Sequence, residues 1–290
     1  MSAEWTRWPA PAKLNLFLHI VGRRADGYHL LQTIFQLLDW GDMVHLRSRP
    51  DGAIVRRDAI PGIAEPQDLG VRAALALKAH TGSPLGAEIR IEKDIPIGGG
   101  LGGGSSDAAS VLVGLNEVWG TRCPAEELAA LGLGLGADVP VFVHGQSAWA
   151  EEIGERLTPL ELPRTHFVIV DPRVSIVTAA LFQAPELTRN SSPTTISDYL
   201  EDLGAGTTNV FAPVARARYP QLAAALDWLD RFGKARLSGS GSAVFAAVDS
   251  EARAQEIVRA CPPEFSARVA RGVDRSPLLD ARDEFRLVQA

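Results

Sequence analysis

A run of glycines about a third of the way along the chain is the feature best suited to chemistry. Six of the seven residues from Gly98 to Gly104 are glycine, so this backbone can adopt conformations that a Cβ atom would forbid. Ser105, Ser106 and Asp107 follow, and these residue types favour the start of a helix. A glycine loop that leads into a helix N-terminus directs several unpaired N–H groups toward one point. Such an arrangement suits a bound phosphate group.

The elements on either side of the loop must position it. Before the loop, Ala87, Ile89 and Ile91 alternate with charged residues, which predicts a strand. After the loop, apolar residues recur at helical spacing from Ala108 to Val118, which predicts a helix. A flexible Gly/Ser linker is the alternative interpretation, but linkers do not usually lie directly between a strand and a helix start.

Two familiar phosphate-binding schemes are missing from the sequence. No G-x-x-x-x-G-K-[ST] motif occurs, so the loop is not a P-loop. Neither H-R-D nor D-F-G occurs, which argues against the protein-kinase scheme.

Three polar side chains in apolar surroundings are candidates for the chemistry itself. Lys13 and Asn15 share one face of a strand predicted over residues 12–20. A lysine there is either a solvated edge charge or a group that faces a cleft, and the sequence leaves both open. Asp138 is a lone acid among small and apolar residues. It is either a helix N-cap or an active-site carboxylate, and these also stay open.

Turns are predicted at Asp26-Gly27 and over Asp39–Asp42. Tyr28 and His29 follow the first of them. An aromatic pair after a turn is usually surface decoration, but it can also offer an aromatic plate and a hydrogen-bonding tip to a ligand.

The remaining patterns alternate between helix and strand. Helices are predicted over residues 71–80, 125–131, 222–232 and 251–260, a hairpin over 147–160, and strands over 167–170, 243–248 and 267–270. A second small-residue loop spans Arg236–Ser242, and residues 184–206 are loop-rich and mixed. These patterns favour a two-domain α+β architecture with a boundary near residues 150–165.

Composition narrows the class of partner. The 290 residues carry 29 Lys and Arg against 35 Asp and Glu, a net charge of −6, which disfavours nucleic-acid binding. Cys123 and Cys261 are too few for a disulfide framework or a zinc site. No apolar span is long enough for a membrane helix or a signal peptide. We therefore expect a cytoplasmic protein without nucleic-acid or membrane partners.

The order and local sequence of these motifs resemble the GHMP kinases, a superfamily of small-molecule kinases. Pro96–Ser106 is similar to their signature loop, Pro11–Leu16 to their first motif and Leu237–Ser242 to their third. Further stretches resemble the branch that phosphorylates a cytidyl diphosphate sugar alcohol in the non-mevalonate isoprenoid route. They are Arg24–His29, Gly136–Phe142 and Pro172–Ile176, and the likeness runs from about Trp8 to about Leu279.

The resemblance implies a two-domain GHMP kinase fold with the active site in the cleft between the domains. Residues 1–160 would form the ATP-binding N-terminal domain, and residues 161–290 the C-terminal, substrate-binding domain. ATP would be the co-substrate and would carry Mg²⁺, with Ser105 or Ser106 as a candidate contact and the other metal ligands open.

The resemblance also implies roles for particular residues. Lys13 and Asp138 would be catalytic, with Asp138 accepting the proton of the substrate hydroxyl and Lys13 stabilising the developing charge. The residues expected to bind ATP are Pro96, Gly98, Gly99, Gly100, Leu101, Gly102, Gly103, Gly104, Ser105 and Ser106. The residues expected to bind the cytidyl substrate are Asn15, Tyr28, His29, Thr178 and Phe182.

One position departs from the family pattern. Asp68 stands before Leu69 where the family commonly has an asparagine in the adenine pocket. An ionised carboxylate only accepts hydrogen bonds, so we expect the usual adenine contact to be altered.

Two other functions stay open at this point. Another GHMP enzyme, of the mevalonate or homoserine kinase type, would keep the glycine loop but lack the Tyr28-His29 site. A non-catalytic nucleotide-binding protein would have no reason to keep both Lys13 and Asp138.

Overall fold

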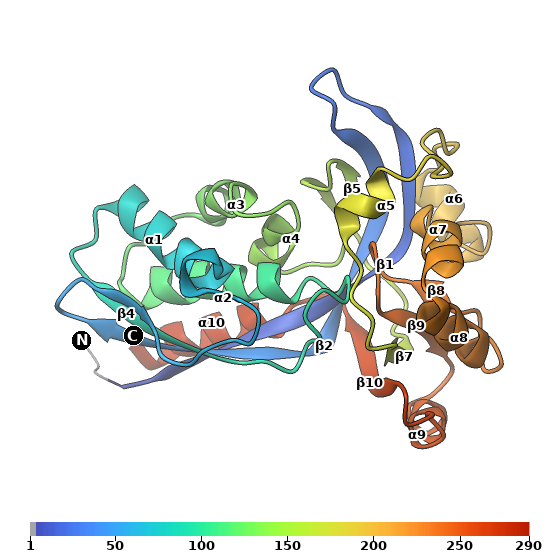
Figure 1. Cartoon of the computed structure of the whole chain (residues 1–290). Helices are drawn as coiled ribbons and strands as arrows, with labels where there is room; N and C mark the ends of the chain where they lie inside the picture. The colour runs from blue at the N-terminus through green and yellow to red at the C-terminus, as the bar shows by residue number, and fades with distance from the viewer. Residues whose placement is uncertain (1–3, 290) are drawn as a thin grey trace.

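A long antiparallel hairpin forms the framework of the protein. The computed structural model describes residues 4–289, and in it β1 (Thr6–Arg23) pairs with β2 (His29–Arg49). Figure 1 shows this hairpin running through both halves of the molecule. The predicted turn at Asp26-Gly27 is confirmed, and Gly27 has a φ of +93°.

The turn predicted over Asp39–Asp42 is wrong, because β2 continues through these residues. Gly41 lies so close to β1 that a Cβ atom would stand 2.1 Å from the carbonyl oxygen of Ala10. The glycine is therefore needed for the approach of two strands, and not for a change of direction.

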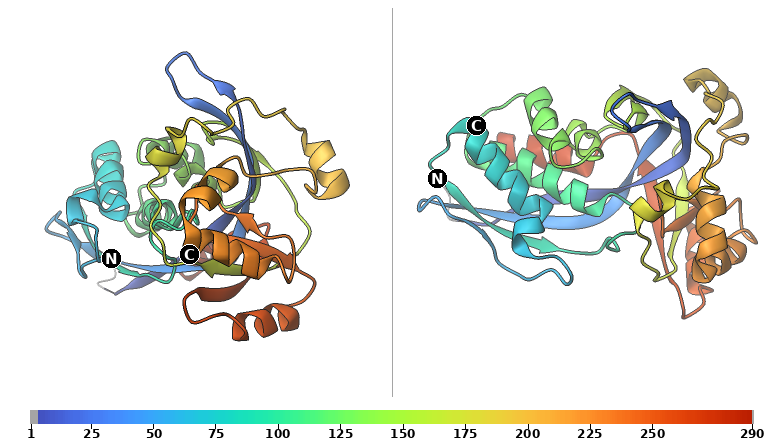
Figure 2. Two further views of the ribbon diagram at one scale, coloured as in Figure 1. Left: turned by 45° about the vertical axis from the view of Figure 1, so that its right-hand side comes forward. Right: turned by 45° about the horizontal axis from the view of Figure 1, so that its top comes forward.

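The first half of the molecule is a sheet with helices on one face (Figures 1 and 2). β4 (Gly86–Glu92) and β5 (Ala148–Glu152) pair antiparallel with β2; β3 (Ile54–Arg56) pairs parallel with β4, and β6 (Arg156–Pro159) antiparallel with β5. The helical segments of this half are η1 (Glu65–Gln67), α1 (Leu69–Thr81), α2 (Gly103–Val118), α3 (Ala125–Leu133), α4 (Val139–His144) and α10 (Pro277–Gln289).

The second half is a smaller antiparallel sheet in the order β10-β7-β9-β8. Its strands are β7 (His166–Asp171), β8 (Arg236–Leu237), β9 (Val244–Val248) and β10 (Ser266–Val273). The helices beside it are α5 (Thr178–Phe182), α6 (Ile196–Asp202), α7 (Phe211–Arg218), α8 (Pro220–Leu229) and α9 (Glu251–Arg259). β10 also pairs with β2, at Gly272 with Leu38, so the two sheets are continuous.

Each half has its own apolar core, and a third cluster joins them. Val111, Leu115 and Phe142 lie in the first core, and Leu181, Leu222 and Val244 in the second. The joining cluster contains Leu14 from β1, Leu101 from the glycine loop and Phe245 from β9. The mixed α+β fold is as expected, and the glycine loop lies where the two halves meet.

Several helices were missing from the sequence prediction, among them α5, α6, α7 and α10. α6 lies within residues 184–206, which were expected to be loop-rich and mixed. Its signal was a capping box in which Thr195 and Asp198 bond reciprocally. α10 returns the end of the chain to the first half, where Leu278 joins the first core. No helix among residues 4–289 is both long enough and apolar enough to cross a membrane.

Candidate active site

Three segments that are distant in sequence meet at the carbonyl group of Gly100. The Lys13 Nζ atom donates to this oxygen at 3.1 Å, and the Ser238 hydroxyl donates to it at 2.9 Å. The backbone N–H of Ala243 also donates to the Gly99 carbonyl at 3.0 Å. The strand motif and the second small-residue loop therefore hold the glycine loop from two sides.

This packing explains why the loop needs glycine. Gly98, Gly100 and Gly102 have φ angles of +77°, +72° and +74°, a region that L-residues rarely adopt. A Cβ atom on Gly100 would also stand 2.2 Å from the carbonyl oxygen of Ser238. Both the conformation and the space exclude a side chain there.

Helix α2 begins earlier than the sequence suggested. Gly102 is its N-cap, and no side chain makes a capping hydrogen bond, so Ser105, Ser106 and Asp107 lie inside the helix and do not cap it. The first helical bond runs from the Ser106 N–H to the Gly102 carbonyl. The N–H groups that precede it have no helical partner, and they carry the positive end of the helix dipole.

A cavity of about 320 Å³ lies against this loop. All of the residues predicted to bind ATP line it except Ser106. The Ser106 side chain is buried instead, and its hydroxyl has no hydrogen-bond partner. The unpaired N–H groups and the cavity together form a site of the kind that binds a nucleotide phosphate.

Lys13, Asn15 and Asp138 lie together at the base of the loop. The Nζ atom of Lys13 is 3.3 Å from Oδ2 of Asp138 and also donates to the Asn15 side chain. Lys13 is only 3% exposed, so it is not a solvated edge charge. Asp138 occupies the N-cap position of α4, but its side chain makes no capping bond. The carboxylate is therefore free to face the lysine, with a third of its surface open to solvent.

Asn15 is anchored by its own contacts. Its Nδ2 atom donates to the Thr33 hydroxyl at 2.9 Å, and its backbone N–H donates to the Ser238 hydroxyl at 3.2 Å. Thr33 in turn donates to the carbonyl of Phe17. These bonds fix the amide beside Lys13.

The residues expected to hold the cytosine lie on two elements that face each other. The rings of His29, at the start of β2, and Phe182, at the end of α5, stack with centroids 5.1 Å apart and planes 20° apart. Tyr28 is 62% exposed, and none of the ring pairs within residues 4–289 includes it. Thr178 shares a hydrogen bond of 2.7 Å with Ser240 of the second small-residue loop. The structure thus places His29, and not Tyr28, against Phe182.

An arginine that the sequence analysis did not select supports this region. Arg189 donates to the carbonyl groups of Phe182 and Ala184, each at 2.8 Å. Burial, followed by the charges of Arg189 and Arg23, lowers the pKa of His29, so its imidazole is neutral at neutral pH. An arginine in a loop gives no signal in a single sequence.

Asp68 is part of a buried ion pair. Its carboxylate caps α1 by accepting from the N–H groups of Gly70 and Val71, and it receives Arg56 Nη1 at 2.9 Å. Both side chains are less than 10% exposed. The oxygens of Asp68 are thus engaged within the protein, beside the cavity that Asp68 lines.

A second buried cluster lies under the glycine loop and was also missed. Lys93 Nζ contacts a carboxylate oxygen of Asp107 at 2.6 Å and one of Asp42. Asp42 also accepts from the backbone N–H groups of Asp94 and Ile95, so it fixes the chain that leads into the loop. Burial raises the pKa of Asp107 to about 7; the charge of Asp42 adds to this shift, and the charge of Lys93 opposes it.

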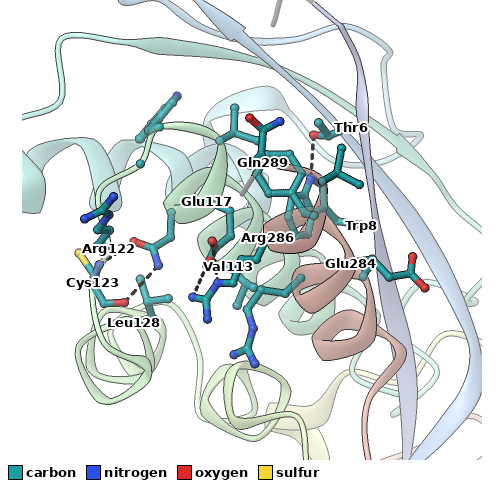
Figure 3. A pocket seen from close by; sticks show the side chains of 18 of the residues that line it. Thr6, Trp8, Val113, Glu117, Arg122, Cys123, Leu128, Glu284, Arg286 and Gln289 are labelled. Carbon is teal, nitrogen blue, oxygen red and sulfur yellow. Dashed lines mark hydrogen bonds and ion pairs between the residues drawn. The ribbon is translucent and has the colours of Figure 1, made fainter. Parts of the chain in front are cut away.

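A larger cavity of about 1160 Å³ lies away from these motifs (Figure 3). It lies between the beginning of β1, the end of α2 and α10, and Trp8, Glu117 and Arg286 are among its lining residues. Arg286 and Glu117 form an ion pair of 2.6 Å across it. None of the predicted site residues lines this cavity.

Two segments of the chain match family descriptions. Residues 68–146 match "GHMP kinases N terminal domain", and residues 184–267 match "GHMP kinases C terminal". The first of these segments contains the whole glycine loop and Asp138, and the second contains the loop at Ser238.

Curated relatives align over nearly the whole chain. A 4-diphosphocytidyl-2-C-methyl-D-erythritol kinase of Xanthomonas campestris pv. campestris is 56% identical over 280 residues, which is 96% of this chain and 94% of that protein. One of Halorhodospira halophila is 54% identical over 279 residues, with coverages of 95% and 96%.

Solved structures agree with this similarity. A crystal structure of 4-(cytidine 5'-diphospho)-2C-methyl-D-erythritol kinase superposes with a TM-score of 0.79 at 33% identity, covering 92% of this chain and 100% of that one. The Methanococcus jannaschii mevalonate kinase superposes with a TM-score of 0.65 at 17% identity, covering 94% of this chain and 99% of that one. At that identity the likeness concerns the fold alone.

Proposed function

This chain belongs to the GHMP kinases and, within them, to the 4-diphosphocytidyl-2-C-methyl-D-erythritol kinases, and we propose that the site described above carries out their reaction. The chain is a phosphotransferase that uses ATP to phosphorylate 4-diphosphocytidyl-2-C-methyl-D-erythritol in isoprenoid precursor biosynthesis. We assign the acceptor to the 2-hydroxyl group of that substrate.

The observation that carries the assignment of residues is the Lys13–Asp138 contact beside the glycine loop. In this proposal, the Asp138 carboxylate accepts the proton of the substrate hydroxyl as the oxygen attacks the γ-phosphorus of ATP. The bond from that phosphorus to the bridging oxygen breaks, and ADP leaves. Lys13 is held by Gly100, Asn15 and Asp138, so its charge stays near the transferring group. Phosphoryl transfer depends mainly on such positioning and charge stabilisation.

The phosphates of ATP would bind the N–H groups of the glycine loop and of the first turn of α2. Gly98, Gly100 and Gly102 have positive φ, and alternation of left-handed and right-handed residues is the backbone conformation in which successive N–H groups can converge on one anion. The helix dipole adds to the attraction for a negative charge. Pro96 and Leu101 shape the cavity wall.

The residues at the loop also fit a Mg²⁺ ion that accompanies ATP. Mg²⁺ prefers oxygen ligands and takes several of them from water and phosphate. The Ser105 hydroxyl lines the nucleotide cavity, and the buried Ser106 hydroxyl lacks a partner in the protein. Either hydroxyl would contribute one oxygen, and the ion would neutralise charge on the phosphates.

For the cytidyl group, the proposal assigns stacking to Tyr28 and Phe182 and hydrogen bonding to His29. The His29 ring stacks on Phe182 in the structure. Cytosine would replace the His29 ring on this face of Phe182. The exposed Tyr28 ring would then close over the base from the other side. Asn15 and Thr178 would hold the rest of the substrate.

The test compares three acceptors in an assay of ATP consumption. We expect turnover with the diphosphocytidyl sugar alcohol and none above background with mevalonate or homoserine. Turnover with mevalonate or homoserine instead would identify a different GHMP enzyme. ATP binding without turnover on any acceptor would indicate a non-catalytic nucleotide-binding protein.

A cytoplasmic location is part of the proposal. Its support is the dependence on ATP and the absence of a disulfide, since Cys123 and Cys261 are both free thiols.

A further inference from the structure

Three potential metal ligands meet on the outer side of the first half. The side chains of His80, Cys123 and Glu127 each offer one ligand atom, and these atoms lie within 4.8 Å of one another. His80 Nε2 is 3.0 Å from Glu127 Oε2. None of the three residues lines the nucleotide cavity.

Three separate segments bring these ligands together. His80 lies in the last turn of α1, Glu127 in the first turn of α3, and Cys123 in the short loop that leads into α3. Figure 1 shows α1 and α3 side by side, and the two helices are in contact. A metal ion at this point would link the end of α1 to the start of α3.

A buried asparagine holds the cysteine in place. The Asn116 side chain is 3% exposed; its Oδ1 atom accepts from the Cys123 N–H at 2.8 Å, and its Nδ2 atom donates to the Cys123 carbonyl at 3.1 Å. Asn116 Oδ1 also accepts from the Thr121 hydroxyl. Both backbone groups of Cys123 are therefore fixed, and Figure 3 shows its sulfur at the margin of the neighbouring cavity.

The distances need only small side-chain movements to fit a zinc ion. With Zn–N and Zn–O bonds of about 2.0–2.1 Å, tetrahedral nitrogen and oxygen ligands lie about 3.3 Å apart. With a Zn–S bond of about 2.3 Å, the sulfur lies about 3.6 Å from either of them. His80 and Glu127 are exposed side chains that can make such adjustments.

We propose that His80, Cys123 and Glu127 bind one Zn²⁺ ion, at a site separate from the one that binds the nucleotide and its Mg²⁺. Thiolate and imidazole ligands favour zinc-type ions over Mg²⁺, which prefers oxygen. Three protein ligands leave a fourth position for water. Two cysteines are too few for a zinc site built mainly from cysteine, but here one cysteine is enough because His80 and Glu127 supply the other ligands.

The test is a titration of the metal-free protein with Zn²⁺ by calorimetry and with Co²⁺ by absorption spectroscopy. We expect one equivalent of each ion to bind, and Co²⁺ to give a thiolate charge-transfer band. Cys123→Ser should abolish that band and weaken Zn²⁺ binding by at least about tenfold. Even a residue that only holds a metal ligand in place by a hydrogen bond changes metal affinity by about 10–100-fold when it is mutated. His80→Gln and Glu127→Gln should weaken binding as well.

Cys261→Ser is the matched control, because Cys261 lies after α9 in the second half and far along the chain from the cluster. It should bind both ions as the parent does. Zn²⁺ should raise the thermal unfolding midpoint of the parent and of Cys261→Ser, but not of Cys123→Ser. Unchanged binding in Cys123→Ser, or the absence of saturable binding and of the charge-transfer band in the parent, would overturn the proposal.

Discussion

Gly102→Ala tests how closely the glycine loop packs on Lys13. A Cβ atom at Gly102 would stand 2.7 Å from Cζ of Phe142 and 3.1 Å from Cγ of Lys13. Phe142 is fully buried, so relief of that contact displaces core atoms at a cost of about 1–3 kcal/mol. The φ of +74° costs a further 1–2 kcal/mol or so. The expected loss in the free energy of unfolding is therefore about 2–5 kcal/mol.

Gly82→Ala supplies the matched control for backbone strain. Gly82 has a φ of +66°, and a Cβ atom there would have no neighbour within 4 Å. We expect Gly82→Ala to lower the free energy of unfolding by only about 1–2 kcal/mol and to keep the parent kcat. Gly102→Ala should also lower kcat by about 10- to 100-fold, because small displacements of catalytic groups cost that much. Urea unfolding and steady-state kinetics measure both effects; equal losses of stability and equal kcat values in the two variants would refute the packing argument.

Three other predictions concern the substrate site and the buried charges. Tyr28→Ala should raise the KM for the cytidyl substrate by about 5- to 150-fold, as expected from a stacking energy of about 1–3 kcal/mol, and leave the KM for ATP unchanged; the reverse pattern would mean that the two nucleotides are misplaced. Arg56→Ala should lower the free energy of unfolding by about 3–5 kcal/mol, because it leaves the Asp68 carboxylate buried without its cation. Arg57 is exposed, and its replacement by alanine is the control: Arg57→Ala should lower the free energy of unfolding by at most about 1 kcal/mol. The raised pKa of Asp107, to about 7, means that the folded state binds a proton at this carboxyl group more tightly than the unfolded chain does. The contribution of Asp107 to stability should therefore fall as the pH rises from about 4 to about 7. Asp107→Asn should remove this contribution, so the difference in urea-unfolding stability between parent and variant should change over that range, and a constant difference would contradict this.

The sequence predicted the elements whose signals are local. The alternation before the glycine loop gave β4, and the helical spacing after it gave α2. Lys13 and Asn15 were expected on one face of a strand, and they are hydrogen-bonded there. The GHMP resemblance extended this local pattern to the mixed α+β fold of both halves.

Other features depend on partners that are distant in the sequence. Gly41 and Asp42 have the composition of a turn, but one allows the approach of β1 and the other binds the chain before the glycine loop. Asp68 departs from the family pattern, and its partner Arg56 is visible only once the chain is folded. Local propensity cannot distinguish a turn residue from a residue with such a long-range contact.

The side-chain directions in the glycine loop also required the structure. The sequence indicates only that side chains are disfavoured along this loop. In the structure, a Cβ atom at Gly102 would point toward Phe142 and Lys13. A substitution at Gly102 would thus act first on the core and on the lysine.

The most direct test of the account is the kcat of Asp138→Asn, measured with the diphosphocytidyl sugar alcohol at saturating ATP. The amide keeps the shape of the side chain but cannot accept the substrate proton, so we expect kcat to fall by about 10²- to 10⁴-fold with little change in the KM for ATP. Asp227→Asn, at an exposed aspartate of the second half, should keep the parent kcat. A kcat for Asp138→Asn within a few-fold of the parent value would contradict the role of this carboxylate as the base.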